Sequence, residues 1–264
     1  MVPRKPYRSC IAGRAALPRC AGGTRRTTAT MEPRMNHKPM PPSDRTRLRR
    51  VAERGHYDRA TLHAIIDAAY LCHLAFTDDN GTHCIPTACW REGEHLYIHG
   101  SNGSRMLKLA ATGSQVCVCV THLDGLVMAR SAFHHSMNYR SAVIYGSFEV
   151  VVGAAKAAAL DAFLEHIAPG RSAQARPGDA NELAATTVLR IGLEEASAKI
   201  RSGGPKDDED DLALPVWAGV LPLALCARPP VPDGEQAGEP AYVSHWREGA
   251  PAPAVRAGSG HGQR

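Results

Sequence analysis

The apolar positions that follow the first sixty residues predict an amphipathic helix. Asp58 is a suitable N-cap residue, and apolar side chains follow at Leu62, Ile65, Ile66 and Ala69. This is the i, i+3, i+4, i+7 spacing of a helix with one buried face. We expect it to be the first helix of the fold.

The segments after this helix alternate apolar and polar residues, as strands do. Residues 71–76 and 82–90 are predicted to be two strands joined by a tight turn at 78–81, and Glu92-Gly93 is predicted to turn the chain into a strand at 95–99. Further strands are predicted at 115–121, in parts of 125–133, at 139–152 with a bulge or bend at Gly146, and at 187–194. The pattern indicates a mainly β, α+β protein built on an antiparallel barrel.

Two further helices interrupt the strands. Ser104 precedes a short stretch, 105–111, whose apolar residues suit a helix, and the alanine-rich stretch 154–167 ends at Pro169-Gly170, where a helix should stop. We see no internal repeat.

Composition changes at both ends of the chain and predicts three regions. Residues 1–43 are a basic tail with no acidic residue before Glu32, 44–227 form the folded domain, and 228–264 are a Pro/Gly-rich extension expected to be mostly extended or disordered. The tail composition fits a mitochondrial transit peptide or a reading frame that begins upstream of the true start. Arginine outnumbers lysine 25 to 6, which favours a start at Met31 or Met35.

Charge and composition exclude several classes of partner. The net charge of +5 comes from residues 1–59, and the remainder carries 16 basic against 22 acidic residues, so we expect no nucleic-acid-binding surface on the fold. No apolar run of about 18 residues is present, so no membrane span is expected. The eight cysteines form no C-x-x-C pair, which favours reduced thiols and a cytoplasmic protein.

Several chemistries lack their motifs. The chain has no P-loop, no G-x-G-x-x-G turn and no G-x-S-x-G nucleophile elbow. The chain has thirteen histidines, which are common metal ligands. His134 and His135 are adjacent, however, and on a strand they would point to opposite faces, so one ion would not bind both. We therefore predict no bound metal ion.

One local pattern suits a phosphate group. The segment 97–106 predicts a strand, a glycine-permissive turn and a helix start, where free N–H groups, the hydroxyl of Ser104 and the guanidinium of Arg105 would meet an anion. The alternative is a plain helix cap beside a surface arginine.

The chain resembles the pyridoxamine 5′-phosphate oxidase-like FMN-binding split barrels, in their nitroimidazole-resistance (Nim-like) branch. The resemblance covers about 45–225, and 130–141 (RSAFHHSMNYRS) is its most specific stretch. It also rests, in chain order, on 54–58 (RGHYD), 85–87 (IPT), 99–101 (HGS), 104–106 (SRM), 121–125 (THLDG), Gly146, 169–171 (PGR) and 217–219 (WAG).

The resemblance implies a six-stranded antiparallel split barrel that forms a homodimer with FMN at the interface. It places the flavin phosphate near Ser104 and Arg105, in a strand-turn-helix that also contributes His99, Gly100 and Met106. It places the ring against the backbone of the second barrel strand, and it assigns polar groups on a later strand to the partner subunit, with dimer packing or strand pairing as the alternative for these. The residues concerned are Ile85, Pro86, Thr87 and Ala88 for the ring, and Asn138, Tyr139, Arg140 and Ser141 for the partner.

The resemblance further implies a flavin-dependent oxidoreductase. Reducing equivalents would pass from NAD(P)H through FMN to a small electrophile such as a nitro compound or a quinone, and vitamin B6 oxidation is not expected because no basic cluster for its phosphate is matched. No catalytic residue is assigned, although His99 or His134 could donate a proton near neutral pH. Two alternatives remain: F420 or haem in place of FMN, and a flavin- or haem-binding protein without turnover. Trp217 could stack on the flavin or substrate, or belong to the core.

Overall fold

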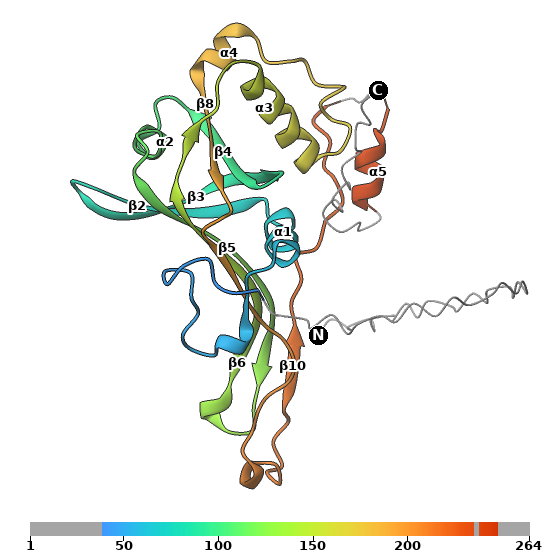
Figure 1. Ribbon diagram of the computed structural model, residues 1–264. Helices are drawn as coiled ribbons and strands as arrows, with labels where there is room; N and C mark the ends of the chain where they lie inside the picture. Colours follow the sequence, from blue (N-terminus) through green and yellow to red (C-terminus); the bar gives the residue numbers. More distant parts are fainter. Residues whose placement is uncertain (1–38, 235–237, 248–264) are drawn as a thin grey trace, which may run out of the picture. The chain divides into compact units, whose positions relative to one another are not determined.

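The computed structural model describes residues 39–234 and 238–247 (Figure 1). The expected basic tail up to residue 38, including both candidate start methionines, and residues 248–264 lie outside the described part. One antiparallel sheet of ten strands dominates the rest, in the order β1-β9-β6-β5-β2-β3-β4-β8-β7, with β10 paired to β5. Its strands are β1 (Gly55–His56), β2 (Leu71–Asp78), β3 (Gly81–Glu92), β4 (His95–Ser101), β5 (Gln115–Met128), β6 (Ser136–Ser147), β7 (Glu149–Val150), β8 (Thr186–Gly192), β9 (Ala196–Arg201) and β10 (Gly219–Pro222).

Five α-helices and three short 3-10 turns are described with the sheet. The helices are α1 (Arg59–Asp67), α2 (Arg105–Ala110), α3 (Gly153–Ile167), α4 (Ala180–Ala185) and α5 (Ala241–Arg247), and the turns are η1 (Ala52–Arg54), η2 (Ala132–His134) and η3 (Glu209–Asp211). The predicted mainly β, α+β fold is confirmed. The sheet is not closed, and it holds ten strands where six are expected. Three of the four additional strands are the short pairings of β1, β7 and β10.

Helix α1 covers one face of the sheet and closes the main core. The Asp58 carboxylate accepts a hydrogen bond from the Thr61 backbone N–H at 2.8 Å, which caps the helix as predicted. Leu62, Ile65 and Ile66 are fully buried against alternate residues of the central strands. The core therefore lies on the α1 side of β2, β5 and β6.

A second, smaller core lies under α3. Trp90 of β3 is fully buried and contacts the Phe163 ring of α3, with ring centroids 5.1 Å apart. Val188 of β8 and Ala159 of α3 complete this cluster. Helix α3 thereby covers β3 and β8.

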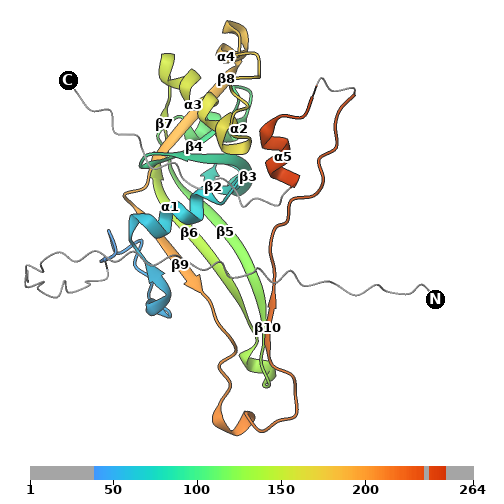
Figure 2. The ribbon, with the colours of Figure 1, turned by 90° about the vertical axis from the view of Figure 1, so that its right-hand side faces the viewer.

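Strands β5, β6 and β10 continue together beyond α1 (Figure 2). The β5–β6 register shifts between Leu123 and Gly125, which leaves Asp124 as the extra residue of a bulge. A Cβ on Gly125 would lie 3.0 Å from the Leu221 carbonyl oxygen and from Val220, so glycine permits β10 to approach β5.

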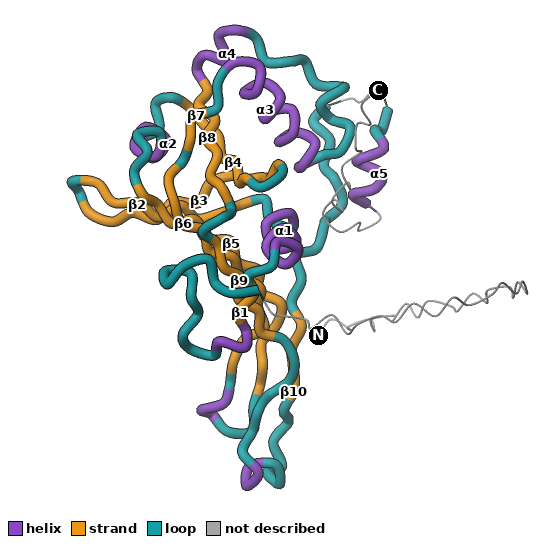
Figure 3. The backbone as a smooth tube through the Cα atoms, viewed as in Figure 1, coloured by secondary structure: helices purple, strands orange, loops and turns teal. Residues whose placement is uncertain are grey.

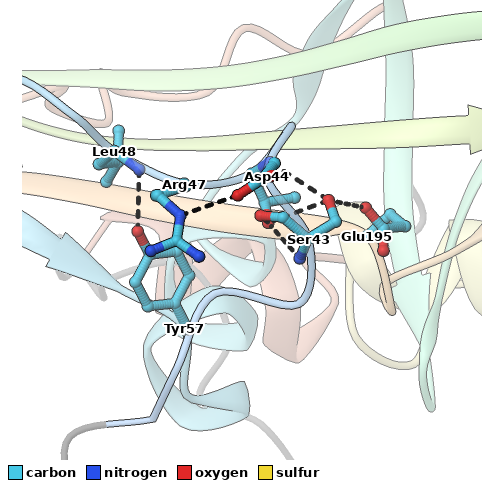
Figure 4. Close-up of polar contacts among 7 residues, drawn as sticks. Ser43, Asp44, Arg47, Leu48, Tyr57 and Glu195 are labelled. Carbon is cyan, nitrogen blue, oxygen red and sulfur yellow. Dashed lines mark hydrogen bonds and ion pairs between the residues drawn. The ribbon is translucent and has the colours of Figure 1, made fainter.

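The segment before β1 is tied to the sheet by side chains (Figure 4). The Ser43 hydroxyl donates a hydrogen bond at 2.5 Å to the carboxylate of Glu195, which lies in the turn between β8 and β9. The Leu48 backbone N–H donates to the Tyr57 hydroxyl at 3.0 Å. These contacts attach residues 43–48 to the body of the protein.

Several predicted boundaries need correction. The expected strands at 115–121 and 125–133 are one strand, β5, because the bulge keeps the ladder continuous, and the chain after Met128 turns through η2. The long strand predicted at 139–152 begins at Ser136 and divides at Phe148 into β6 and β7, next to Gly146 with its positive φ of 150°. The acidic segment 207–211 contains η3, and α5 forms inside the extension at 228–264, which is expected to be mostly extended or disordered.

Candidate functional site

The face of the sheet opposite α1 is open and largely apolar. Registered partners share a face, so the pairing of His73 with both Pro86 and Cys119 aligns β3, β2 and β5 on this side. The exposed apolar residues of the face are Leu71 on β2, Leu123 and Leu126 on β5, Met137 on β6 and Leu221 on β10. We call these residues, with Pro86 and Ala88, the open face. Figure 3 draws the strands that carry the open face in orange, with β2 and β3 across the middle and β5, β6 and β10 extending below them.

The predicted ring-binding segment of β3 lies at the border of the open face. Pro86 and Ala88 pair with His73 and Leu71 and belong to the open face. Ile85 packs against the main core, and Thr87 pairs with the buried Cys72. Only every second side chain of this segment therefore lies on the open face. The backbone of all four residues can be reached from that face.

The predicted phosphate-binding residues lie beside the first residues of β3, near His83. Ser104 caps α2 by accepting from the Leu107 backbone N–H at 3.4 Å, and the Arg105 side chain is 56% exposed. Arg105 and Lys108 line an open hollow of about 530 Å³ together with the Asp78 carboxylate and with Gly103, Leu109, Thr112 and Ser114. Two cationic side chains against one carboxylate leave a net positive charge, which favours an anionic ligand.

Arg105 has two partners that the sequence did not indicate. Its guanidinium lies 3.6 Å from Asp78 and 3.4 Å from the His83 ring, and His83 contacts Asp78 at 2.8 Å. The hydrogen bond from His83, with one from the Asn80 backbone, lowers the pKa of the Asp78 carboxyl. The β2–β3 hairpin brings Asp78 and His83 to α2. In the sequence, the spacing of five residues between Asp78 and His83 around the predicted turn is the signal that indicates this pair.

His83 and Pro86 lie on opposite faces of β3. His83 pairs with the buried Phe76, whose ring stacks on it with centroids 5.0 Å apart, whereas Pro86 pairs with His73 of the open face. Among the described residues β4 pairs with β3 only at 89–92, so the edge of β3 beside His83 and Pro86 is open. A ligand with an apolar ring and a phosphate would pass over this edge to reach Arg105 from the open face.

The side chains of His99 and Met106 lie away from this site. His99 contacts the rings of Phe163 and Trp90 in the second core, and Met106 is buried in the main core. A Cβ on Gly100 would lie 2.9 Å from Leu107, so this glycine allows β4 to approach α2. At these positions only the backbone is available to a ligand near Ser104.

The four residues predicted on β6 are separated from the β3 segment by β5 and β2. Asn138 is buried, accepts from Arg201 and donates to the Gly203 carbonyl oxygen at 3.1 Å. Arg140 forms a two-point contact with Asp124, both hydrogen bonds measuring 2.9 Å, and Tyr139 and Ser141 pair with β5 and β9. Within one chain these residues serve strand pairing, and their assignment to a partner subunit's flavin stays a prediction.

The two proton-donor candidates differ in environment. Burial lowers the pKa of His99, whose Nδ1 has no hydrogen-bond partner, so this imidazole is neutral at pH 7. His134 lies in η2, 3.2 Å from Asp208. Trp217 is exposed, and its ring lies against Gly219 at the start of β10.

The comparison with protein families agrees with this architecture. Residues 58–200 match the model of the family described as pyridoxamine 5′-phosphate oxidase. The chain belongs to this family. The match runs from the N-cap of α1 to β9, so it includes both predicted halves of the site.

Two solved structures are similar over most of the chain. The flavocytochrome Anf3 from Azotobacter vinelandii is 38% identical with a TM-score of 0.75, and the match covers 78% of this chain and 98% of that one. The FAD and heme binding protein from Mycobacterium smegmatis is 36% identical with a TM-score of 0.71, covering 73% of this chain and 97% of that one. No curated protein sequence matches the chain. Among the described residues, no helix is both long and apolar enough to cross a membrane.

Proposed function

We propose that this protein binds a flavin between the open face and Arg105 and works as a homodimeric oxidoreductase. Its flavin would accept reducing equivalents from NAD(P)H and pass them to a small electrophile of the nitro or quinone type. The observation that carries the proposal is that β3 carries Pro86 and Ala88 on the open face and, three residues before Pro86, brings His83 to Arg105 beside the hollow. The family membership and the names of the two similar structures support it.

The residues present fit a flavin. A flavin has a flat apolar ring and a phosphate end. Strand β3 offers an open apolar surface at Pro86 and Ala88, and the neighbouring α2 offers the mostly exposed guanidinium of Arg105. Arg105 is held by Asp78 and His83, which fixes the guanidinium beside the hollow. We expected FMN from the sequence, and the Mycobacterium smegmatis relative is named for FAD, so the identity of the flavin is part of the test.

The flavin supplies the redox chemistry, and the chain binds and shields it. Backbone N–H and C=O groups at 85–88 would hydrogen-bond the polar edge of the ring. Arg105 and Lys108 would compensate the phosphate charge. A second subunit on the open face would exclude water from the ring and add groups from β6 such as Tyr139.

Haem is the second cofactor that we include in the proposal. Both similar structures carry names that join flavin and haem or cytochrome. The open face offers one histidine by register, His73, which is exposed between Leu71 and Ala75. An exposed imidazole beside apolar surface is a suitable haem-iron ligand.

The test is a visible absorption spectrum of the purified protein, followed by anaerobic addition of NADH or NADPH. Flavin bands that bleach on this addition would support the oxidoreductase, and mass analysis of the released cofactor distinguishes FMN, FAD and F420. A sharp Soret band, which is the strong absorption of haem, would support the second cofactor if it is lost in His73→Ala. Flavin bands that resist every reductant would favour a binding protein without turnover, and absence of any flavin affinity would overturn the proposal.

A further inference from the structure

A group of metal-ligating side chains lies outside the proposed flavin site, where the β5–β6 connection meets the loop between β9 and β10. One ligand atom from each of His134, Asp208 and Asp211 lies within 4.8 Å of the other two. His134 Nε2 lies 3.2 Å from Asp208 Oδ2. His134 belongs to η2 and Asp211 to η3, two of the short helical turns drawn in purple in Figure 3.

The local chain conformation aligns the two carboxylates. The Asp211 backbone N–H donates to the Asp208 carbonyl oxygen at 3.0 Å, which closes the 3-10 turn η3. A 3-10 helix has three residues per turn, so side chains at i and i+3 lie one above the other. Asp208 and Asp211 are therefore presented on one side of the turn, toward His134.

A separate ion pair holds the two loops together. Asp207 accepts hydrogen bonds from the Arg130 backbone N–H and from its guanidinium, both at 2.9 Å. The Asp207 side chain is 1% exposed, so this contact is a buried clamp. Since Asp208 follows Asp207 directly and His134 follows Arg130 by four residues, the clamp fixes the approach of the three ligands without using any of them.

The charge of the segment favours a cation. Residues 207–211 are five consecutive acidic residues, and Arg130 compensates the charge of Asp207. The carboxylates of Asp208 and Asp211 remain within 4.8 Å of each other, where like charges repel. A bound divalent ion would replace this repulsion with two attractive contacts.

We propose that His134, Asp208 and Asp211 bind a divalent transition-metal ion that joins the two loops. One imidazole nitrogen and two carboxylate oxygens suit zinc, cobalt or manganese, whereas calcium and magnesium prefer sites made only of oxygen. Water would complete the coordination because Asp208 is exposed. The sequence pattern does not predict this site, because the adjacent histidines His134 and His135 would point to opposite faces of a strand. The other two ligands, Asp208 and Asp211, lie 74 and 77 residues further along the chain.

The experiment is a titration of the protein with cobalt(II), followed by calorimetry and by the visible spectrum of the ion. Thiolate ligation by any of the eight cysteines adds a sulfur-to-cobalt charge-transfer band, which this site would lack. We expect His134→Ala and Asp211→Asn each to weaken binding about tenfold or more. Asp210→Asn is the matched control, because it removes the same charge from the same acidic segment without removing a ligand.

A second measurement keeps the test independent of affinity alone. Cobalt should raise the thermal midpoint of the wild-type protein and of Asp210→Asn, but not that of His134→Ala, since only a ligand of the folded state stabilises it. Equal weakening by Asp210→Asn and Asp211→Asn would show nonspecific attraction to the acidic segment and overturn the proposal. Unchanged binding in His134→Ala would overturn it as well.

Discussion

Arg91 of β3 holds the last residue of α1, Asp67, by two parallel hydrogen bonds, Nε to Oδ1 and Nη2 to Oδ2, each 2.7 Å long. The two side chains are only 10% and 15% exposed, so the pair is largely withdrawn from water. Removal of one partner leaves the other charge buried without compensation. The contact also connects the helix that closes the main core to the strand of the proposed flavin site.

We therefore expect Asp67→Ala to lower the free energy of unfolding by about 3–5 kcal/mol, measured by urea denaturation. Arg176→Ala is the control, because Arg176 and Glu182 form a similar two-point pair at the surface, and Glu182 keeps its capping hydrogen bond from the Asp179 N–H. Water solvates and screens an exposed pair of this kind, so its loss should change stability much less. Equal effects of the two substitutions would contradict a buried contribution from the Asp67–Arg91 pair.

Arg105→Ala should weaken flavin binding about 10- to 150-fold, because it removes a charge-assisted contact of about 1.5–3 kcal/mol to the phosphate. Titration of the apoprotein with FMN and FAD, followed by quenching of flavin fluorescence, measures the change. The folded state should persist because the Arg105 side chain is mostly exposed. Arg47→Ala removes another exposed arginine that pairs with an aspartate, Asp44, and should leave affinity unchanged. Unaltered flavin affinity in Arg105→Ala would exclude Arg105 as the phosphate ligand.

The open face should be the surface that joins two subunits. Met137 is 52% exposed and lies across β5 from Leu221, with Leu126 between them. Met137→Asp should convert the dimer to a monomer of 28.3 kDa, which light scattering after gel filtration detects. An unpaired charge buried in an apolar interface costs more free energy than the remaining apolar contacts contribute to association.

Val152→Asp provides the matched control for the dimer. Val152 is an exposed apolar residue at the start of α3, outside the open face, and its substitution should leave the mass unchanged. A wild-type protein that is monomeric at all concentrations, or a Met137→Asp variant that stays dimeric, would remove the open face from consideration as the subunit contact.

His99 should make stability depend on pH below neutrality. Burial lowers the pKa of this imidazole in the folded state, so the unfolded chain binds the proton first as the pH falls below about 6.5. Stability that is present at neutral pH is then lost progressively toward the folded-state pKa. The urea midpoint of the wild type should therefore fall more between about pH 7 and pH 5 than that of His99→Gln. Parallel pH profiles would show that another group causes the loss.

The elements that the sequence predicts well are those determined by nearby residues. Asp58 and the apolar residues after it define α1 locally, and Ser104 defines the start of α2 in the same way. Strand β9 was missed because Ala196–Arg201 begins with small residues of low strand propensity, and its place is set by pairing with β6 more than fifty residues earlier. Strand β10 was missed for a similar reason, since only four residues pair and one is Pro222.

The same distinction applies to the candidate site. Arg105 was found because a strand, a turn and a helix start follow one another in the sequence. Its contacts with Asp78 and His83 depend on how the β2–β3 hairpin folds toward α2, which no local pattern encodes. The alternate orientation of Ile85 and Thr87 likewise follows from register with β2 and not from composition.

The position of β10 has a consequence for the behaviour of the chain at high concentration. One edge of β5 pairs with β2 at 117–119 and with β10 at 125–128, so β10 occupies backbone groups that would otherwise be an unpaired strand edge. Such edges recruit strands from other molecules and start aggregation. The new edge that β10 presents is four residues long and contains Pro222, whose nitrogen carries no hydrogen to donate. Gly125, by admitting β10, thus helps to protect the protein against edge-to-edge association.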